Sequence, residues 1–244
     1  MTLTPQDVFN ALPIVRDARL ALSTAMPCSV VVPFATYSPW LGDAEFQATY
    51  EAIRPNSLVD QYRCYELWRL VEQTVRLGGD ILEVGVWRGG TGCLMAARAK
   101  ALRAPATVYL CDTFKGVVKA GDKDPGYKGG EHADTSADMV GALAARLMLP
   151  NVRILEGVFP DDTGDELAAH SFALCHIDVD VYKSARAVVE WVWPRLAVGG
   201  VVVYDDYGFA GCDGVTQLVN ERAGQSGALT LHNLNGHAVV VKFA

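Results

Sequence analysis

From residue 80 onward, short runs of apolar residues alternate with stretches in which apolar positions recur at helical spacing. The apolar runs lie at 80–86, 107–112, 152–157, 172–178 and 200–205, and the intervening helices are expected near 91–103, 136–148, 161–168 and 183–196. Nearly continuous apolar strands separated by helices are typical of βαβ units that form a buried parallel sheet. We therefore predict an α/β protein with a doubly wound, mostly parallel sheet of Rossmann-like type.

The end of the chain adds two further strands to this sheet. After a helix expected near 213–223, apolar runs at 228–233 and 237–243 are joined through the polar turn NLNG. Two strands joined by so short a polar turn form an antiparallel hairpin. The complete prediction is a seven-stranded sheet that ends in an antiparallel C-terminal hairpin.

The N-terminal quarter of the chain has a different pattern. Residues 5–25 show helical spacing, and residues 27–50 are rich in proline and aromatic residues and are expected to form an irregular covering segment. A helix is predicted from Ser57, a good N-cap, to Leu77, where two glycines follow. We therefore divide the chain into an N-terminal extension or lid at 1–56 and the α/β domain at 57–244.

Composition narrows the class of protein. The formal net charge is −7, so a nucleic-acid partner is not expected. No apolar run reaches the length of a membrane span, and the N-terminus lacks a signal-peptide pattern, so we expect a cytoplasmic protein with no membrane partner. The six cysteines show no C-x-x-C spacing, which disfavours a zinc site. The apolar N-terminal segments would suit the subunit interface of a homo-oligomer.

Acidic residues follow two of the predicted strands at the point where each strand ends. HIDVDVY contains Asp178 and Asp180, and VVVYDDY contains Asp205 and Asp206. Ligands of open α/β sheets bind beyond the carboxyl ends of the strands, so these four carboxylates are expected to meet in one small volume. Their mutual repulsion would need compensation by a cation or by protons. The pattern predicts a divalent metal site, and helix capping or simple solvation is the alternative.

A glycine-rich turn follows the first predicted strand. ILEVGVWRGGTG places Glu83 and Gly85 at a strand-to-helix turn, but it matches neither the dinucleotide fingerprint nor the phosphate loop. The next strand ends in Asp112, an acid at the position that often binds ribose hydroxyls. A generic glycine turn is the alternative, but the two features together favour an adenosine-containing ligand without a pyrophosphate, such as S-adenosylmethionine.

Four ordered motifs then resemble a known family. E-x-G-x-W-R-G-G, D-T-F-x-G at 112–116, I-D-x-D-x-Y-x-S at 177–184 and G-G-x-x-x-x-D-D-Y at 199–207 are similar to those of the macrocin O-methyltransferases. Members of this family methylate sugar hydroxyls of antibiotics, using S-adenosylmethionine and magnesium. The chain departs from the family pattern at 117–119 and 214–217, both near the expected acceptor pocket, so the resemblance leaves the acceptor open.

The resemblance implies a role for individual residues. Those implied to contact the cofactor are Ser57, Leu58, Glu83, Gly85, Asp112, Thr113, Gly157 and Val158. Those implied to bind Mg²⁺ are Asp178, Asp205 and Asp206, and Asp180 is implied to be the general base. The resemblance therefore implies a magnesium-dependent transfer of a methyl group to a hydroxyl of a small, glycosylated acceptor.

Several alternatives stay open at this point. Asp180 could instead be a fourth metal ligand or the cap of the following helix, and Lys183 is a second candidate for the base. His176 could face the site or be a hydrogen-bonded core residue, and His132 lies in a long loop that suggests a flexible cover over the acceptor. The competing functions are a catechol-type O-methyltransferase, a glycosyltransferase that uses Asp178-Val179-Asp180 as its D-x-D motif, and a cofactor-binding protein without activity.

Overall fold

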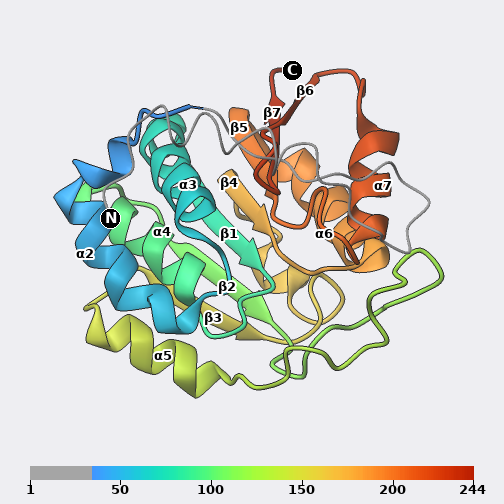
Figure 1. The fold of residues 1–244 in the computed structure, drawn as a ribbon, viewed down its shortest axis with the longest axis horizontal. Coiled ribbons are helices and arrows are strands. Elements are labelled where there is room, and N and C mark those ends of the chain that lie inside the picture. The colour runs from blue at the N-terminus through green and yellow to red at the C-terminus, as the bar shows by residue number, and fades with distance from the viewer. Residues whose placement is uncertain (1–34) are drawn as a thin grey trace, which may run out of the picture. The chain divides into compact units, whose positions relative to one another are not determined.

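A seven-stranded sheet runs through the middle of the protein in the computed structural model, which describes residues 35–244 (Figure 1). The strands lie in the order β3-β2-β1-β4-β5-β7-β6. They are β1 (Asp80–Val84), β2 (Val108–Asp112), β3 (Val152–Glu156), β4 (Phe172–Ile177), β5 (Leu196–Tyr204), β6 (Ala228–His232) and β7 (Ala238–Lys242). The first five are parallel to one another, whereas β7 is antiparallel to both β5 and β6. The predicted doubly wound sheet with a C-terminal hairpin is confirmed.

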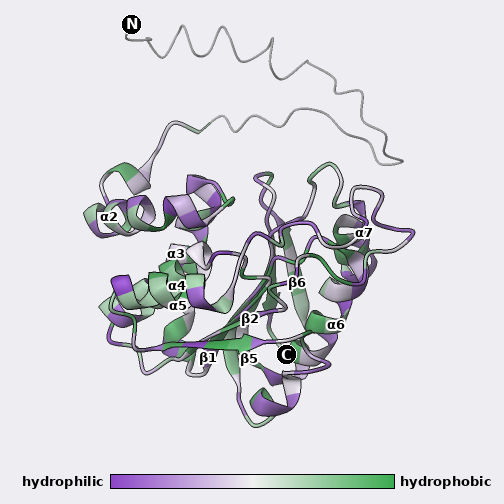
Figure 2. Ribbon diagram, turned by 90° about the horizontal axis from the view of Figure 1, so that it is seen from below, coloured by the Kyte–Doolittle hydropathy of each residue, from purple (hydrophilic) through white to green (hydrophobic). Residues whose placement is uncertain are grey.

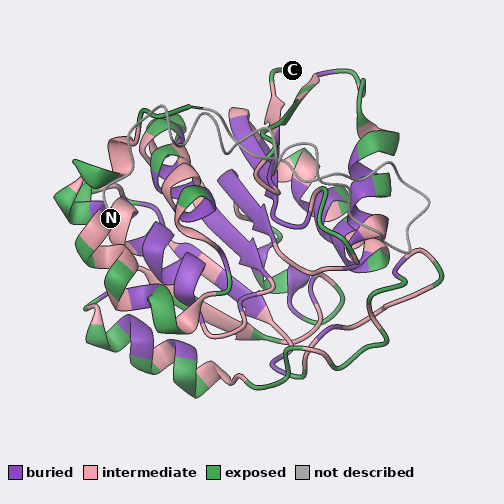
Figure 3. Cartoon of the chain, in the orientation of Figure 1, coloured by how far each residue is buried: buried purple, intermediate pink, exposed green. Residues whose placement is uncertain are grey.

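The centre of the sheet is mostly apolar because both of its faces are covered, and Glu83 on β1 and His176 on β4 are its buried polar exceptions. All six residues of β4 are buried, and β4 pairs with β1 on one side and β5 on the other. Continuous apolar strands of this kind belong to parallel sheets packed between two helical layers. Figures 2 and 3 show the central strands as hydrophobic and buried.

The helices form two layers, one on each face of the sheet. The helices fall into two groups, because the buried side chains form two separate clusters. One cluster contains residues of the first group of helices, and the other contains residues of the second group. The first group is α2 (Ala44–Ile53), α3 (Gln61–Thr74), α4 (Gly90–Ala101) and α5 (Ala137–Arg146), and the second is α6 (Tyr182–Val192) and α7 (Asp213–Arg222). Short 3₁₀ turns lie at Pro39–Leu41, Arg54–Asn56, Val75–Leu77, Gly164–Leu167 and Trp193–Arg195.

Three local predictions are wrong. The segment 161–168 forms only a 3₁₀ turn, because it contains Gly164 and is too short to stabilise a helix on its own. The segment 27–50 is not irregular throughout, because Asp43 caps α2 by accepting a hydrogen bond from the backbone N–H of Phe46. The cap of α3 is Asp60 rather than Ser57: its carboxylate accepts hydrogen bonds from two backbone N–H groups at the start of that helix.

The predicted helical pattern at 5–25 lies outside the described residues. Pro39–Ala244 form one compact unit, and of the residues before it only 35–38 are described. The predicted boundary at residue 56 stays a prediction, although Phe46 and Ile53 are already fully buried in the core of this unit. In the described part of the chain, no helix combines the length and the apolar character that a membrane span requires.

Candidate active site

A cavity of about 340 Å³ opens beyond the carboxyl ends of β1, β2, β4 and β5. This is the edge of the sheet at which ligands of doubly wound proteins bind. Eleven of the twelve predicted site residues line it: Ser57, Leu58, Gly85, Asp112, Thr113, Gly157, Val158, Asp178, Asp180, Asp205 and Asp206. Glu83 is the exception, since its side chain is fully buried and does not line the cavity.

Three of the acids form a tight carboxylate cluster. Asp178, Asp205 and Asp206 each offer an oxygen, and these oxygens lie within 4.8 Å of one another. Burial, followed by the nearby carboxylates of Asp205 and Asp206, holds the pKa of Asp178 well above its ordinary value. Burial and then the charge of Asp180 raise the pKa of Asp206 in the same way. A bound cation would reverse this repulsion.

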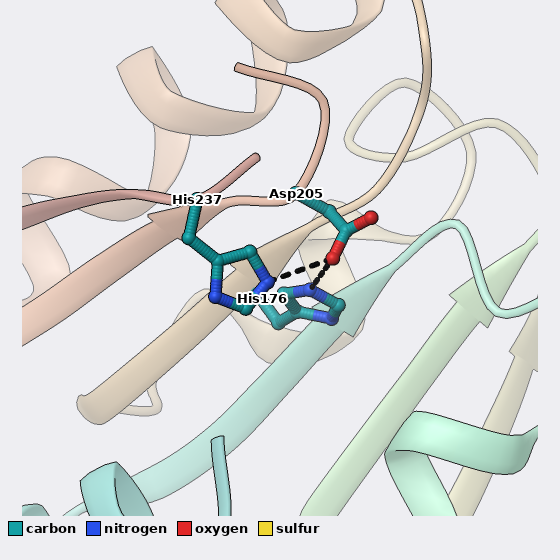
Figure 4. Close-up of side chains that lie close together, drawn as sticks. All are labelled: His176, Asp205 and His237. Carbon is teal, nitrogen blue, oxygen red and sulfur yellow. Dashed lines mark hydrogen bonds and ion pairs between the residues drawn. The ribbon is translucent and has the colours of Figure 1, made fainter. Parts of the chain in front are cut away.

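Asp205 differs from its neighbours because positive and polar groups surround it (Figure 4). Its Oδ2 forms an ion pair with the buried guanidinium of Arg63, and its Oδ1 faces ring nitrogens of His176 and His237. Burial raises the pKa of Asp205, but the hydrogen bonds from His176 and His237 outweigh it and lower the pKa below its ordinary value. Burial likewise opposes protonation of His176, yet its hydrogen bonds to Asp205 and Glu83 raise its pKa to about 10. His176 is thus a buried, hydrogen-bonded residue that also contacts the site.

The carboxylate of Asp180 meets a tyrosine from the long loop after β2. The Tyr127 hydroxyl donates a hydrogen bond of 2.5 Å to Oδ1 of Asp180, and the backbone N–H of Asp180 donates to Asp206. Asp180 has a φ of +64°, a left-handed conformation that Asp adopts more readily than most residues. Burial raises its pKa above the ordinary value. Asp180, Asp206 and Cys212 also offer three atoms within 4.8 Å, so the role of a fourth ligand stays open for Asp180.

The suggestion that Asp180 caps the following helix is wrong. Val181 precedes α6 and makes no side-chain capping bond. Asp124, which is only 2% exposed, accepts a hydrogen bond of 2.8 Å from the backbone N–H of Tyr182 and one of 3.0 Å from Gly121. The cap of α6 therefore comes from the long loop 116–135, and it anchors that loop beside Asp180.

The far end of the same loop is tied to the glycine turn after β1. Asp134 accepts hydrogen bonds from the indole of Trp87 and from the guanidinium of Arg88, and Thr135 donates to the backbone carbonyl of Trp87. Between the two anchors, Tyr127 and His132 line the cavity. The loop therefore forms one wall of the cavity, and its role as a flexible cover over the acceptor stays a prediction.

The glycine turn brings the two halves of the site into contact. Gly85 has a φ of +85°, and a Cβ atom at this position would lie 1.6 Å from the carbonyl oxygen of Asp178. Only glycine allows this approach. Glu83 lies below the turn, with Oε1 2.9 Å from Nδ1 of His176 and Oε2 buried without a hydrogen-bond partner among the described residues.

Asp112 orders the turns around it, and its carboxylate has little capacity left to accept further hydrogen bonds. Its Oδ2 accepts hydrogen bonds from the backbone N–H groups of Val86 and Trp87, and its Oδ1 accepts one from Phe114. A carboxylate has about four lone-pair sites. About one site on Oδ1 is therefore free for a ribose hydroxyl, so the acceptance of two ribose hydroxyls expected from the sequence is not available in this arrangement.

The chemistry of the donor atoms fits a hard divalent cation. The cluster offers carboxylate oxygens, which Mg²⁺ and Mn²⁺ prefer, and no side-chain hydrogen bond occupies the carboxylate of Asp178 among the described residues. Burial and the neighbouring carboxylates raise its pKa, and a bound cation would stabilise its charged form. Asp178, Asp205 and Asp206 could therefore hold such an ion.

Sequence reasoning missed four residues of the site: Arg63, Asp124, Tyr127 and His237. Each of them contacts an acid or a helix terminus that lies far away in the sequence. Arg63 and Asp205, for example, are 142 residues apart. No local pattern marks such pairs. A weak signal existed for Asp124 and Tyr127, because both lie in one long loop and such loops often carry function.

Comparisons with known proteins agree with this geometry. The family profile described as macrocin-O-methyltransferase (TylF) matches residues 54–234. Mycinamicin III 3''-O-methyltransferase of Micromonospora griseorubida is 31% identical over 187 residues, which cover 70% of this chain and 72% of that protein. Demethyldecarbamoylnovobiocin O-methyltransferase of Streptomyces niveus is 34% identical over 142 residues, which cover 53% of each protein.

A solved structure shows the same fold. The O-methyltransferase NovP superposes with a TM-score of 0.65 at 25% sequence identity, covering 78% of this chain and 82% of NovP. The resemblance noted in the sequence is thereby confirmed, and the interpretation of Asp178-Val179-Asp180 as a glycosyltransferase motif is wrong. The chain belongs to the macrocin O-methyltransferase family and is an O-methyltransferase.

Proposed function

We propose that this protein transfers a methyl group from S-adenosylmethionine to a sugar hydroxyl of a glycosylated natural product, with Mg²⁺ bound by Asp178, Asp205 and Asp206. One observation carries the proposal: a single cavity joins the glycine turn and Asp112 to an all-carboxylate cluster. The names of the relatives support it, since one of them methylates a 3''-position of mycinamicin III and another a novobiocin precursor.

The donor would lie against the wall formed by β1 and β2. Gly85 exposes bare backbone there, and the free site on Oδ1 of Asp112 can accept one ribose hydroxyl. Thr113 and Gly157 continue the same wall. S-adenosylmethionine supplies an electrophilic methyl group on a positively charged sulfur, and the acidic character of this cavity suits that charge.

The metal would lie at the other wall, where three strand-end carboxylates meet. When bound there, Mg²⁺ supplies the Lewis acidity that makes a nearby hydroxyl easier to deprotonate. The protein's part is to hold Asp178, Asp205 and Asp206 in place while leaving lone-pair sites of the cluster free for the ion. Arg63 is the only lysine or arginine side chain that lines the described cavity, and it is already paired with Asp60 and Asp205.

Asp180 is the candidate for the proton acceptor. Its carboxylate lines the cavity, and its hydrogen bond with Tyr127 shows that it accepts from a hydroxyl in this position. The O–H bond of the acceptor would break as its proton passes to Asp180, while the oxygen forms its new bond to the methyl carbon and the carbon–sulfur bond of the donor breaks. One positioned base of this kind contributes about 10²–10⁴-fold to a rate. Lys183 does not line the cavity.

The charge of the cavity favours a neutral glycoside over a nucleotide-activated sugar. A diphosphate group would bring two negative charges next to four carboxylates. Among the described residues, no lysine lines the cavity, and the charge of Arg63 is already paired. Phosphate recognition by charged side chains normally depends on free arginine or lysine residues. The exposed apolar side chains of Leu58 and Phe209 at the cavity wall suit an aglycone instead.

The test is a methyl-transfer assay that follows S-adenosylhomocysteine by mass spectrometry. A panel of neutral antibiotic glycosides and one nucleotide sugar are incubated with S-adenosylmethionine, with EDTA or with added Mg²⁺. We expect turnover of a neutral glycoside that EDTA abolishes and Mg²⁺ restores. Asp206→Asn should lose turnover but still bind S-adenosylhomocysteine in a calorimetric titration. Full activity after rigorous chelation would refute the metal site, and turnover of the nucleotide sugar alone would refute the acceptor class.

A further inference from the structure

Asp205 receives its partners from three parts of the protein, and Figure 4 shows the two histidines among them. Nε2 of His237, next to β7, lies 2.8 Å from Oδ1, and Nε2 of His176, on β4, lies 3.4 Å from the same oxygen. Arg63, on α3, pairs with Oδ2. Both histidine side chains are fully buried, so water does not compete for these contacts. The two imidazoles converge on one oxygen of one metal-ligand candidate.

A second carboxylate contacts the other ring nitrogen, Nδ1, of each histidine. Nδ1 of His176 lies 2.9 Å from Oε1 of Glu83, and Nδ1 of His237 lies 2.5 Å from Oε2 of Glu66. The amide groups of Asn233 and Asn235 hold Glu66 in turn. A hydrogen bond at the far nitrogen fixes both the orientation of an imidazole and the nitrogen that faces its other partner. The positions of both rings are therefore determined from two sides.

This arrangement selects which oxygen of Asp205 is free. Two ring nitrogens fill the two lone-pair sites of Oδ1, and Arg63 takes one site of Oδ2. One site on Oδ2 is left. Without the two rings, the carboxylate could turn about its terminal bond, a torsion with a broad energy minimum.

We propose that His176 and His237 are positioning residues that occupy Oδ1 of Asp205 and so present Oδ2 to the divalent cation. This inference rests on the proposed function, since it takes Asp178, Asp205 and Asp206 as the ligands. The two rings are not ligands themselves, because every one of their nitrogens already faces a carboxylate.

The experiment measures Mn²⁺ binding by electron paramagnetic resonance of the free ion, with no acceptor and no turnover. His237→Leu should weaken Mn²⁺ binding about 10–100-fold, the usual effect of removing a residue that orients a metal ligand. His237→Gln should retain most of the affinity, because its amide still donates toward Asp205. His170→Leu is the matched control: His170 pairs with Asp80 and does not line the cavity, so Mn²⁺ affinity should not change.

Two further measurements separate positioning from damage to the fold. The affinity for S-adenosylhomocysteine should stay within about twofold of wild type in His237→Leu, because the donor wall does not include His237. Should His237→Leu not fold, Glu66→Gln removes the charge behind the ring at a partly exposed position and should weaken Mn²⁺ binding in the same direction.

The outcomes are distinct. Wild-type protein that binds no Mn²⁺ would refute the metal part of the proposed function. If the wild-type protein binds Mn²⁺ and both His237→Leu and Glu66→Gln bind it with the same affinity, the positioning role alone is overturned. Loss of a second bound Mn²⁺ in His237→Leu, with the first retained, would mean that the rings are ligands and would also overturn it.

Discussion

The capping contact of Asp124 predicts a stability loss that can be worked out from its two hydrogen bonds. In Asp124→Ala, the backbone N–H of Tyr182 loses its cap, which costs about 1 kcal/mol. The N–H of Gly121 loses a second bond, which costs about 1 kcal/mol more. We therefore expect the free energy of unfolding to fall by about 2 kcal/mol in total, with the melting temperature falling by about 4–8 °C for a chain of this length.

Urea denaturation followed by circular dichroism measures this loss, provided that the dependence of unfolding on urea is the same for each variant. Asp122→Ala is the matched control, because it removes the same charge two residues away from an exposed side chain. Asp124→Asn should fall between the two, since an amide oxygen can still accept from Tyr182 but its nitrogen cannot accept from Gly121. If Asp124→Ala and Asp122→Ala differ by less than about 0.5 kcal/mol, Asp124 does not cap α6 in solution.

Three further predictions concern the cavity and its loop. In Asp180→Asn, turnover should fall by about 10²–10⁴ at every Mg²⁺ concentration if Asp180 is the base, whereas recovery at high Mg²⁺ would identify it as a ligand. In Asp112→Ala, calorimetry should show S-adenosylhomocysteine binding weakened by about 1–3 kcal/mol, because the variant loses a charged hydrogen bond to the ligand and the contacts that order the Val86–Trp87 turn. Unchanged affinity would exclude Asp112 from the donor site. A Cβ at Gly214 would lie 2.0 Å from Oδ1 of Asp124, so Gly214→Ala should destabilise the wild type more than it destabilises Asp124→Ala, and additive losses in this double-mutant cycle would contradict the contact.

The sheet could be predicted from the sequence because its signal is local. Each central strand is buried on both faces, so a run such as the one that forms β4 must be almost entirely apolar, and its neighbours in the chain must form the covering helices. The strand-end acids could be predicted for the same reason, since topology alone brings the ends of β4 and β5 together. The predicted strand boundaries therefore lie close to those in the structure, except for β5, which begins earlier at Leu196.

The contacts that hold these acids could not be predicted, because they join distant parts of the chain. Asp124 and Tyr182 are 58 residues apart, and Glu66 and His237 are 171 residues apart. Which of several nearby polar residues caps a helix also depends on backbone direction, and this is why Asp60 rather than Ser57 caps α3. Composition likewise gave the wrong picture of α2, where aromatic residues serve as one apolar face of a helix.

The position of β7 has a consequence for how this protein is made. β7 follows β6 in the chain but lies between β5 and β6 in the sheet, and His237 at its start reaches the aspartate that ends β5. A nascent chain that has been translated only as far as residue 236 therefore has a gap inside its sheet and an incompletely held Asp205. The catalytic edge of the sheet can be completed only after translation has passed β7. Domains generally fold as units during synthesis, so the chemistry of this protein becomes available only once the whole sheet, β7 included, has been made.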